Sequence, residues 1–170
     1  MSKEKKNIQE LDEIDIAILQ ELQNDSRLSL QELSKRLNQP SSTIHYRLKR
    51  LEEQQYIEGF YVKINPEKFQ IDYLTIIMVR AVYKSKYYKT IGEQLKNIPG
   101  IWGIYFILGE WDFVILSRSM DRNSYLEILD KLMEIEGIER TSSQVVVKVI
   151  KEDPRLDLEL LNIKNLERDQ

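Results

Sequence analysis

Residues 41–51, Ser-Ser-Thr-Ile-His-Tyr-Arg-Leu-Lys-Arg-Leu, alternate apolar and polar side chains with the period of an α-helix. Wound at about 100° per residue, the segment gathers Ile44, Leu48 and Leu51 on one side. The other side carries hydroxyl, aromatic and basic groups from Ser42, Tyr46, Lys49 and Arg50, with His45 and Arg47 at the edges. The pattern predicts a helix with one face for a core and one face for the major groove of DNA. A surface helix with a solvated basic face is the alternative interpretation.

A second short apolar pattern and a break come directly before this segment. Leu30, Leu33 and Leu37 recur at helical spacing, and Asn38-Gln39-Pro40 then interrupts the pattern. Proline disfavours helix in the residue before it but is tolerated in the first turn of a new helix, and asparagine readily adopts a positive φ. Two short helices joined by about three residues, the second of them basic, follow the helix-turn-helix plan.

The flanking segments complete a small domain. Asp12 and Asp15 form an acidic pair at the start of a further predicted helix, whose apolar positions are Leu11, Ile14, Ile18 and Leu22. After the basic helix, residues 56–64 are rich in β-forming side chains, with turn chemistry at Glu58-Gly59. We predict that residues 56–64 form a wing and its return strand.

Residues 11–64 resemble the DNA-binding domain of the Lrp/AsnC family, the feast/famine transcription regulators, in its archaeal form. The resemblance rests on Leu11-Asp12-Glu13-Ile14-Asp15 with Ile18-Leu19, Asn24-Asp25-Ser26-Arg27, Glu32-Leu33-Ser34, Ser42-Thr43-Ile44 with Arg47-Leu48-Lys49-Arg50-Leu51-Glu52, and Ile57-Glu58-Gly59-Phe60. Three positions depart from the family, because Asn38 replaces a usual glycine, Pro40 a serine, and Gln55 stands near another glycine. We expect mild backbone strain or an altered helix cap at Gln55.

Positive charge is concentrated in this domain. The chain has a formal net charge of −3, yet the stretch between Glu32 and Glu52 contains five basic residues and no acid. A local basic patch on an acidic protein favours a defined surface for double-stranded DNA over nonspecific coating. The candidate DNA contacts are Lys35, Ser41, Ser42, Thr43, His45, Tyr46, Arg47, Lys49 and Arg50.

The second half of the chain contains an internal repeat with a constant offset of 37 residues, as from Tyr88 to Tyr125. The first copy, Tyr88, Ile91, Leu95, Ile98, Gly100 and Ile101, recurs as Tyr125, Ile128, Leu132, Ile135, Gly137 and Ile138. Each copy predicts an amphipathic helix, a glycine stop and the start of a strand. With strands at 74–83, 101–108, 111–117 and 144–150, the order is β-α-β-β-α-β, a ferredoxin-like unit.

This half also resembles the Lrp/AsnC family, whose C-terminal domain has that fold. The match is Gly109-Glu110-Trp111-Asp112, as the family's Gly-x-x-Asp hairpin, and Gly137-Ile138 leading into Thr141. The resemblance implies that a small ligand, typically an amino acid, binds near the hairpin at contacts between C-terminal domains. The candidate effector residues are Gly109, Glu110, Trp111, Asp112, Thr141, Ser142 and Ser143. Taken alone, these residues also fit a turn aspartate, a core or interface tryptophan and plain strand hydroxyls.

Composition narrows the chemistry. With one histidine, no cysteine, no glycine-rich phosphate loop and no visible Ser-His-Asp set, we predict no metal, no cofactor and no enzymatic activity. The lack of cysteine, of an apolar signal core after Met1 and of an apolar run of transmembrane length predicts a cytoplasmic protein without membrane contact.

The sequence divides into a winged helix-turn-helix domain at 8–64, a linker at 65–72, a ferredoxin-like oligomerisation and effector domain at 73–152 and a tail at 153–170. In the tail, Leu156, Leu160 and Ile163 fit a helix, whereas Leu156, Leu158 and Leu160 fit a strand. We expect the tail to pack on its own chain or on a neighbouring copy.

The predicted fold class is therefore α+β, and the predicted function is transcription regulation by sequence-specific DNA binding, modulated by an amino acid. We expect a homodimer, with dimers stacked into an octamer as a further option, on a near-palindromic site with half-sites about one helical turn apart. The alternatives are an architectural DNA-binding protein without an effector, and a ferredoxin-like enzyme with a partner-binding helix-turn-helix.

Overall fold

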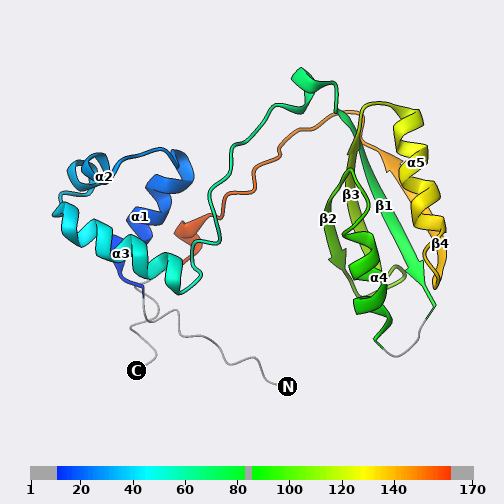
Figure 1. The fold of residues 1–170 in the computed structure, drawn as a ribbon, viewed down its shortest axis with the longest axis horizontal. Helices are drawn as coiled ribbons and strands as arrows, with labels where there is room; N and C mark the ends of the chain where they lie inside the picture. Colours follow the sequence, from blue (N-terminus) through cyan, green and yellow to red (C-terminus); the bar gives the residue numbers. More distant parts are fainter. Residues whose placement is uncertain (1–10, 83–85, 162–170) are drawn as a thin grey trace. The chain divides into compact units, whose positions relative to one another are not determined.

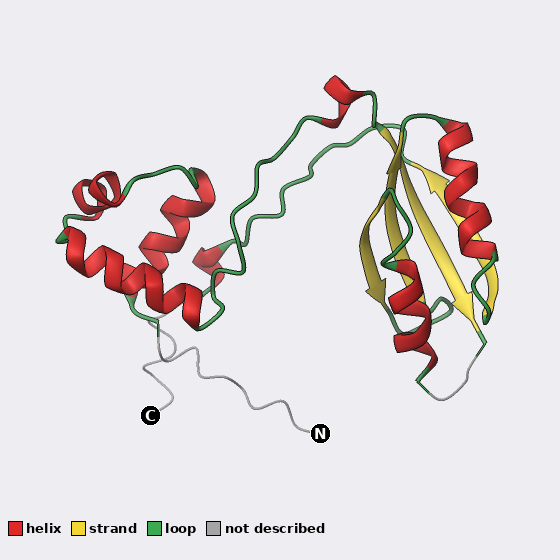
Figure 2. Cartoon of the chain, viewed as in Figure 1, coloured by secondary structure: helices red, strands yellow, loops and turns green. Residues whose placement is uncertain are grey.

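The computed structural model describes residues 11–82 and 86–161 of the 170-residue chain. These residues fall into two compact units (Figure 2). The helical unit consists of residues 11–62 together with 153–161, and the sheet unit runs from Lys63 to Glu152. Within the described ranges, no helix is long and apolar enough to cross a membrane.

Three helices build the helical unit: α1 (Glu13–Asn24), α2 (Leu30–Leu37) and α3 (Ser41–Glu53) (Figure 1). Capping boxes start the first two, from Asp12 with Asp15 and from Ser29 with Glu32, so the orphan N–H groups of each first turn are satisfied. The core of the unit consists of Ile18, Leu22, Leu33, Ile44 and Leu51.

The turn between α2 and α3 has the predicted chemistry. Asn38 ends α2 in the left-handed conformation, with φ 49° and ψ 45°, and Pro40 precedes the first residue of α3. The side chain of Ser34 donates a 2.6 Å hydrogen bond to the carbonyl oxygen of Gln39 and fixes the turn. Gln55, where strain was expected, also has a positive φ of 62°. The helix-turn-helix prediction is confirmed.

The hairpin predicted at residues 56–64 is not formed. The described chain has no strand between α3 and β1, and residues 57–65 run without ladder pairing. Phe60, Tyr61 and Val62 are 52%, 70% and 83% exposed, so nothing in the single chain covers the apolar side chains that gave the β pattern. The return strand was therefore a wrong expectation for this isolated chain.

The sheet unit has the predicted β-α-β-β-α-β order. Its elements are β1 (Tyr73–Ala81), α4 (Tyr87–Leu95), β2 (Ile101–Phe106), β3 (Phe113–Ser119), α5 (Arg122–Met133) and β4 (Ile138–Val145). All strand pairs are antiparallel, in the order β2-β3-β1-β4. The ferredoxin-like prediction is confirmed, but the last strand is wrong by several residues: it starts at Ile138, directly after the glycine, and not at residue 144. Tyr83, the predicted end of the first strand, lies outside the described residues.

The two copies of the repeat form one core. Both helices bury their apolar sides against alternate residues of β1 and β3, among them Ile77, Val79 and Ile115. Gly100 shows why a glycine ends the first copy: its φ is +87°, and an added Cβ would lie 2.7 Å from the carbonyl oxygen of Arg118.

The opposite face of the sheet is not covered by helices. Alternation along the strands directs Ile76 and Met78 of β1 and Val114 and Leu116 of β3 to this open face. On β2, Tyr105 pairs with Val114 and is 55% exposed. On β4, Ser142 pairs with Met78 and Arg140 with Arg80. The open face thus has an apolar centre and a polar edge.

The described part of the tail, residues 153–161, forms neither an α-helix nor a strand. This part contains a short 3-10 turn, Leu158–Leu160. Asp157 caps the start of the turn, because its side chain accepts a hydrogen bond from the N–H of Glu159. Leu156 and Leu160 are 73% and 81% exposed, so the predicted apolar stripe is not buried, and Ile163 lies outside the described residues. A second 3-10 turn, Pro66–Phe69, lies in the linker.

Candidate nucleic-acid interface and effector region

The outward face of α3 carries most of the predicted DNA contacts. Ser41, Ser42, His45, Tyr46 and Lys49 are exposed, and Thr43 is half-buried. Tyr46, at 67% exposure, is a large aromatic side chain that the core does not use. No side chain caps the N-terminus of α3, so its first-turn N–H groups remain available to an anion. Hydroxyl, imidazole, phenol and ammonium groups therefore share one solvent-facing surface.

Arg47 and Arg50, although on the same helix, turn toward α1. Arg47 Nη1 lies 2.7 Å from Asp12 Oδ2 and 2.9 Å from Asp15 Oδ1, and Arg50 Nη2 binds Asp15 Oδ2. The carboxylate of Asp15 is fully buried, and the Arg47 side chain is only 19% exposed. Sequence reasoning missed this cluster, because it placed Arg50 on the outward face and Arg47 at its edge and counted both as DNA contacts. The structure gives both guanidinium groups an internal role in holding α3 on α1.

The same cluster shifts two pKa values. Burial raises the pKa of Asp12, but hydrogen bonds from the N–H of Asp15 and from Arg47 outweigh it and hold that pKa below its ordinary value of 3.8. Burial lowers the pKa of Arg47, whereas hydrogen bonds to Asp12 and Asp15 raise it overall. Both groups stay charged near neutral pH.

The remaining basic residues differ in how freely they reach solvent. Lys35 is exposed, whereas Arg36 Nη1 lies 2.6 Å from Glu21 Oε2 of α1. Lys49 lies 3.6 Å from Glu53, one turn later on α3, in a pair with both side chains about two-thirds exposed. Such an exposed ion pair contributes little to the stability of the fold, so Lys49 can leave Glu53 and bind a DNA phosphate instead.

The hairpin between β2 and β3 carries the second predicted site. Its aspartate, Asp112, is buried and hydrogen-bonded within the sheet unit. Asp112 is 4% exposed, its Oδ2 accepts from the N–H of Ala81 at 2.8 Å, and its Oδ1 accepts from the hydroxyl of Tyr87 at 2.7 Å. In the described structure, both oxygens of this candidate effector residue fasten the hairpin to β1 and α4. The backbone N–H of Asp112 also donates to the carbonyl oxygen of Val79.

Glu110 and Trp111 instead reach the polar edge of the open face. Arg140 Nη2 lies 2.7 Å from Glu110 Oε1, and its guanidinium carbon lies 4.7 Å from the centroid of the Trp111 ring. Arg80 Nη1 donates to the carbonyl oxygen of Glu110 at 3.2 Å and pairs with Glu139. The sequence prediction did not include these two arginines. Arg80 of β1 and Arg140 of β4 pair directly across the sheet, and pairing of the two strands would have revealed them.

The three predicted hydroxyls do not share one surface. Ser142 pairs with Met78 and lies on the open face, near Arg140. Thr141 pairs with Val79 and Ser143 with Ile77, so these two lie on the face that the helices cover. Of the predicted effector set, Glu110 and Trp111 therefore meet at Arg140, while Ser142 lies two residues further along the same face of β4. Gly109 belongs to the same exposed hairpin as Glu110.

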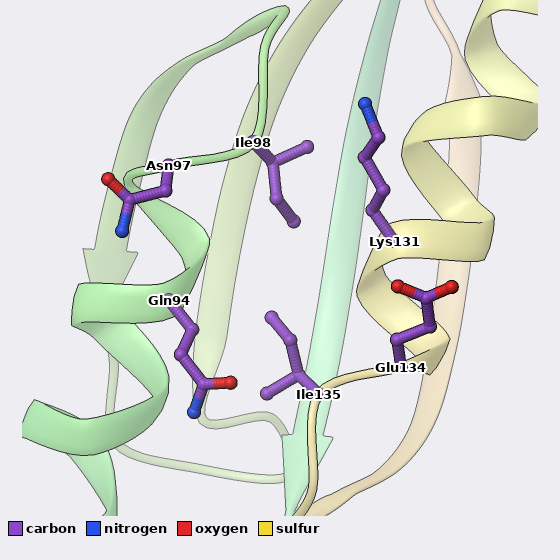
Figure 3. A pocket seen from close by; sticks show the side chains of 6 residues that line it. All are labelled: Gln94, Asn97, Ile98, Lys131, Glu134 and Ile135. Atoms are coloured by element: carbon purple, nitrogen blue, oxygen red, sulfur yellow. The ribbon is translucent and has the colours of Figure 1, made fainter.

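A shallow, open hollow of the sheet unit lies away from the hairpin. It has a volume of about 370 Å³ and lies between the C-terminal ends of α4 and α5, lined by Gln94, Asn97, Ile98, Lys131, Glu134 and Ile135 (Figure 3). These residues are three pairs of repeat equivalents, so the hollow is the seam between the two copies. It contains none of the predicted effector residues. Among the described residues, no cluster of His, Asp or Glu side chains is suited to hold a metal ion.

Comparison with known proteins finds a family match in each half of the chain. Residues 11–58 match the winged helix-turn-helix DNA-binding family, and residues 74–156 match the Lrp/AsnC ligand binding domain. An uncharacterized HTH-type transcriptional regulator of Pyrococcus horikoshii is 35% identical over 145 residues, which cover 84% of this chain and 97% of that protein.

The chain belongs to the Lrp/AsnC family of transcription regulators.

Other Lrp/AsnC relatives extend the match. The HTH-type transcriptional regulator FL11 of Pyrococcus furiosus is 35% identical over 146 residues, covering 86% of this chain and 95% of FL11. A transcriptional regulator of Neisseria meningitidis, solved in complex with L-Met, superimposes with a TM-score of 0.83 at 28% identity, covering 89% of this chain and 99% of that chain. E. coli AsnC, at 20% identity and a TM-score of 0.76, shares the fold. The protein is thus a DNA-binding transcription regulator of the Lrp/AsnC type.

Proposed function

We propose that the outward face of α3 reads DNA sequence and that Ser42, His45 and Tyr46 are its base-reading side chains. This proposal rests on a difference between side chains of α3. Arg47 and Arg50 bind acidic residues of α1, whereas Ser42, His45 and Tyr46 make no hydrogen bond within the described part of the chain. Groups without internal partners are free to meet base edges in the major groove. Lys35, Lys49 and the hydroxyls of Ser41 and Thr43 supply phosphate contacts around them.

Selection of bound sequences from a random DNA library tests this role. The wild-type chain should return a near-palindrome, and His45→Ala should change the preferred base at one or two positions of each half-site, with a discrimination of about 1–3 kcal/mol lost there. Arg27→Ala serves as the control, because Arg27 is 89% exposed, pairs with Asp25 and lies before α2. The same motif from wild type and from the His45 and Tyr46 variants would contradict direct readout by α3.

We further propose that the open face of the sheet packs against the same face of a second copy, which makes a homodimer with two α3 helices. An isologous contact of this kind gives the two-fold symmetry that a near-palindromic site requires. The support is the apolar row of Ile76, Met78, Val114 and Leu116, with the half-exposed Tyr105 paired beside it.

Light scattering tests the dimer. Leu116→Glu introduces a charge at the centre of the row and should yield monomers at micromolar concentration. Leu126→Glu introduces the same charge on the outer side of α5, where Leu126 is already 43% exposed, and should remain dimeric. A wild-type monomer, or equal behaviour of the two variants, would refute the proposed contact. A measured mass of eight chains would instead indicate that dimers stack into an octamer.

The effector that we propose is an α-amino acid bound at Glu110, Trp111 and Arg140. Asp112 is occupied, so the free charges at the hairpin are the carboxylate of Glu110 and the guanidinium of Arg140, which pair with each other in the unliganded chain. A zwitterion inserted between them satisfies both, its ammonium on Glu110 and its carboxylate on Arg140. The L-Met complex of the Neisseria meningitidis regulator supports an amino acid as the ligand class.

Trp111 provides the readout for this proposal. In a Trp102→Phe background, displacement of Arg140 from the Trp111 ring should change the fluorescence, and the melting temperature should rise as the ligand exceeds its dissociation constant. Arg140→Ala should abolish both responses, and Arg122→Ala, on α5, should retain them. No response to any of the twenty amino acids would leave a ligand-independent, architectural DNA-binding protein as the better description.

A further inference from the structure

The acidic cluster that binds Arg47 has an inner and an outer member. Asp15 Oδ1 lies 2.9 Å from Arg47 Nη1 and its side chain is fully buried, whereas Asp12 Oδ2 lies 2.7 Å from the same nitrogen and its side chain is 53% exposed. Arg47 therefore lies between the interior of the helical unit and its surface. The partner on the surface side is Asp12, which solvent and ions can reach.

The charges of this cluster cancel each other. Asp12 and Asp15 provide two carboxylates, and Arg47 and Arg50 provide two guanidinium groups. The four groups together carry no net charge, so these two arginines of α3 add little attraction for the phosphates of DNA. The outward positive charge of α3 therefore comes mainly from Lys49, whose partner is an exposed acid.

Asp12 also closes the N-terminus of α1 to anions. Its Oδ1 accepts hydrogen bonds from the N–H of Ile14 at 3.0 Å and from the N–H of Asp15 at 2.9 Å. An uncapped helix offers such N–H groups to a phosphate, and a carboxylate at the same place repels it. The situation at α3 is the opposite, because no side chain caps its first turn. One carboxylate thus occupies two groups that could bind phosphate, a guanidinium and a helix N-terminus.

We propose that Asp12 is a positioning residue that competes with DNA phosphates for Arg47 and so limits the affinity of the protein for every DNA sequence. A phosphate contact does not depend on the bases, so a released Arg47 would strengthen binding to random and to cognate DNA alike. The genome offers a vast excess of random sites, and a chain with one more phosphate contact stays on them longer. This role rests on α3 as the helix that lies against DNA.

Three variants separate this role from a general effect of charge. Asp12→Asn removes the negative charge and keeps the cap, because asparagine caps helices about as well as aspartate does. Glu13→Gln removes the same charge one residue later, from an exposed side chain that binds no arginine within the described residues. Asp12→Asn/Arg47→Gln additionally removes the guanidinium that the first variant should release.

Fluorescence anisotropy of a labelled random duplex, titrated with the full chain at several salt concentrations, measures the effect. Asp12→Asn should steepen the slope of log affinity against log salt by about one unit, because one phosphate contact is gained. Its gain in affinity over wild type should therefore be about threefold larger at about 50 mM salt than at about 200 mM salt. Glu13→Gln should keep the wild-type slope, and Asp12→Asn/Arg47→Gln should return to it.

Three results would overturn the proposal: an unchanged slope in Asp12→Asn, equal steepening in Glu13→Gln, or steepening that persists without Arg47. Urea denaturation followed by circular dichroism establishes that each variant is folded at the assay temperature. Asp12→Ser, which keeps a capping hydroxyl without the charge, provides a second variant for which the same steepening is expected.

A second arm uses a duplex that carries the site selected by the wild-type chain. Asp12→Asn should raise the affinity for this duplex by the same factor as for the random duplex, and it should select the same motif. A changed motif would mean that Arg47 contacts bases, which overturns its role as a phosphate contact. If the wild-type chain selects no motif, base reading by α3 is refuted, and the slopes on random DNA still decide the role of Asp12.

Discussion

Asp15 of α1 and Arg47 of α3 form an ion pair in which the carboxylate is fully buried and the Nη1–Oδ1 distance is 2.9 Å. Arg50 binds the other oxygen of the same carboxylate. One buried carboxylate therefore binds two basic residues of the helix that carries the proposed base-reading side chains, and Asp12 adds a second negative charge beside Arg47. The orientation of α3 depends on this cluster as well as on the apolar core beneath it.

Replacing Asp15 should destabilise the helical unit more than any surface acid. Asp15→Asn leaves two guanidinium groups without their shared partner, and removing one member of a buried pair typically costs about 3 kcal/mol. Urea denaturation followed by circular dichroism measures the loss. Glu13→Gln, an exposed acid in the same first turn, should leave the midpoint nearly unchanged. Similar midpoints for the two variants would mean that the cluster does not hold the helices together.

Acid should weaken the same cluster through Asp12. A carboxyl group whose pKa is lowered by folding stabilises the folded state above its unfolded pKa, and this stabilisation is lost as the pH falls through the folded pKa. For Asp12 the loss begins below its ordinary value of 3.8. Thermal denaturation should therefore show a steeper decline in wild type than in Asp12→Asn below about pH 4. Parallel declines would contradict this assignment.

Salt dependence separates the outward lysine from the inward arginines. Lys49→Ala should weaken binding to all DNA sequences alike and reduce the slope of log affinity against log salt by about one unit, because one phosphate contact is lost. Its urea midpoint should not change, since Lys49 has only an exposed partner in Glu53. Arg47→Ala should instead lower the urea midpoint. An unchanged slope for Lys49→Ala would place this residue off the DNA.

Asp112 should prove to be a stability residue of the sheet unit. Asp112→Ala removes the acceptor of the Ala81 N–H and the Tyr87 hydroxyl, and an unsatisfied buried donor costs about 2 kcal/mol. The variant should melt at a lower temperature with no ligand present. Glu110→Ala, on the exposed side of the hairpin, should melt as wild type without ligand and lose the amino-acid response. A wild-type melting temperature for Asp112→Ala would return this carboxylate to the ligand.

Local signals in the sequence were enough to predict the elements that depend on near neighbours. The left-handed turn at Asn38, the Asp12–Asp15 cap and the 37-residue repeat all involve residues a few positions apart or a pattern that repeats, and the structure has each of them. The direction of Arg47 depends on Asp15, 32 positions earlier, and no spacing rule reveals such a pair. Residues 56–64 were predicted to form a hairpin from their β-forming side chains and the turn chemistry at Glu58-Gly59, but no described segment pairs with them.

The candidate effector residues show the same limit. The sequence showed residues 109–112 as one contiguous motif. The role of each residue, however, depends on which strand its side chain contacts. Asp112 lies beside Val79 and Ala81 of β1, whereas Glu110 meets Arg80 and Arg140 on the open face. Sequence distance from the hairpin to these partners is about 30 residues, beyond any local pattern.

Gln23 Nε2 of α1 donates a hydrogen bond to the carbonyl oxygen of Leu156 in the tail, 133 positions later in the chain, so the helical unit is completed late in synthesis. The three helices of the unit emerge from the ribosome first and can pack their core at once. The contact of Gln23 with Leu156 forms only after the whole sheet unit has been translated. A nascent chain that ends before residue 156 therefore displays α3 without this contact at the end of α1.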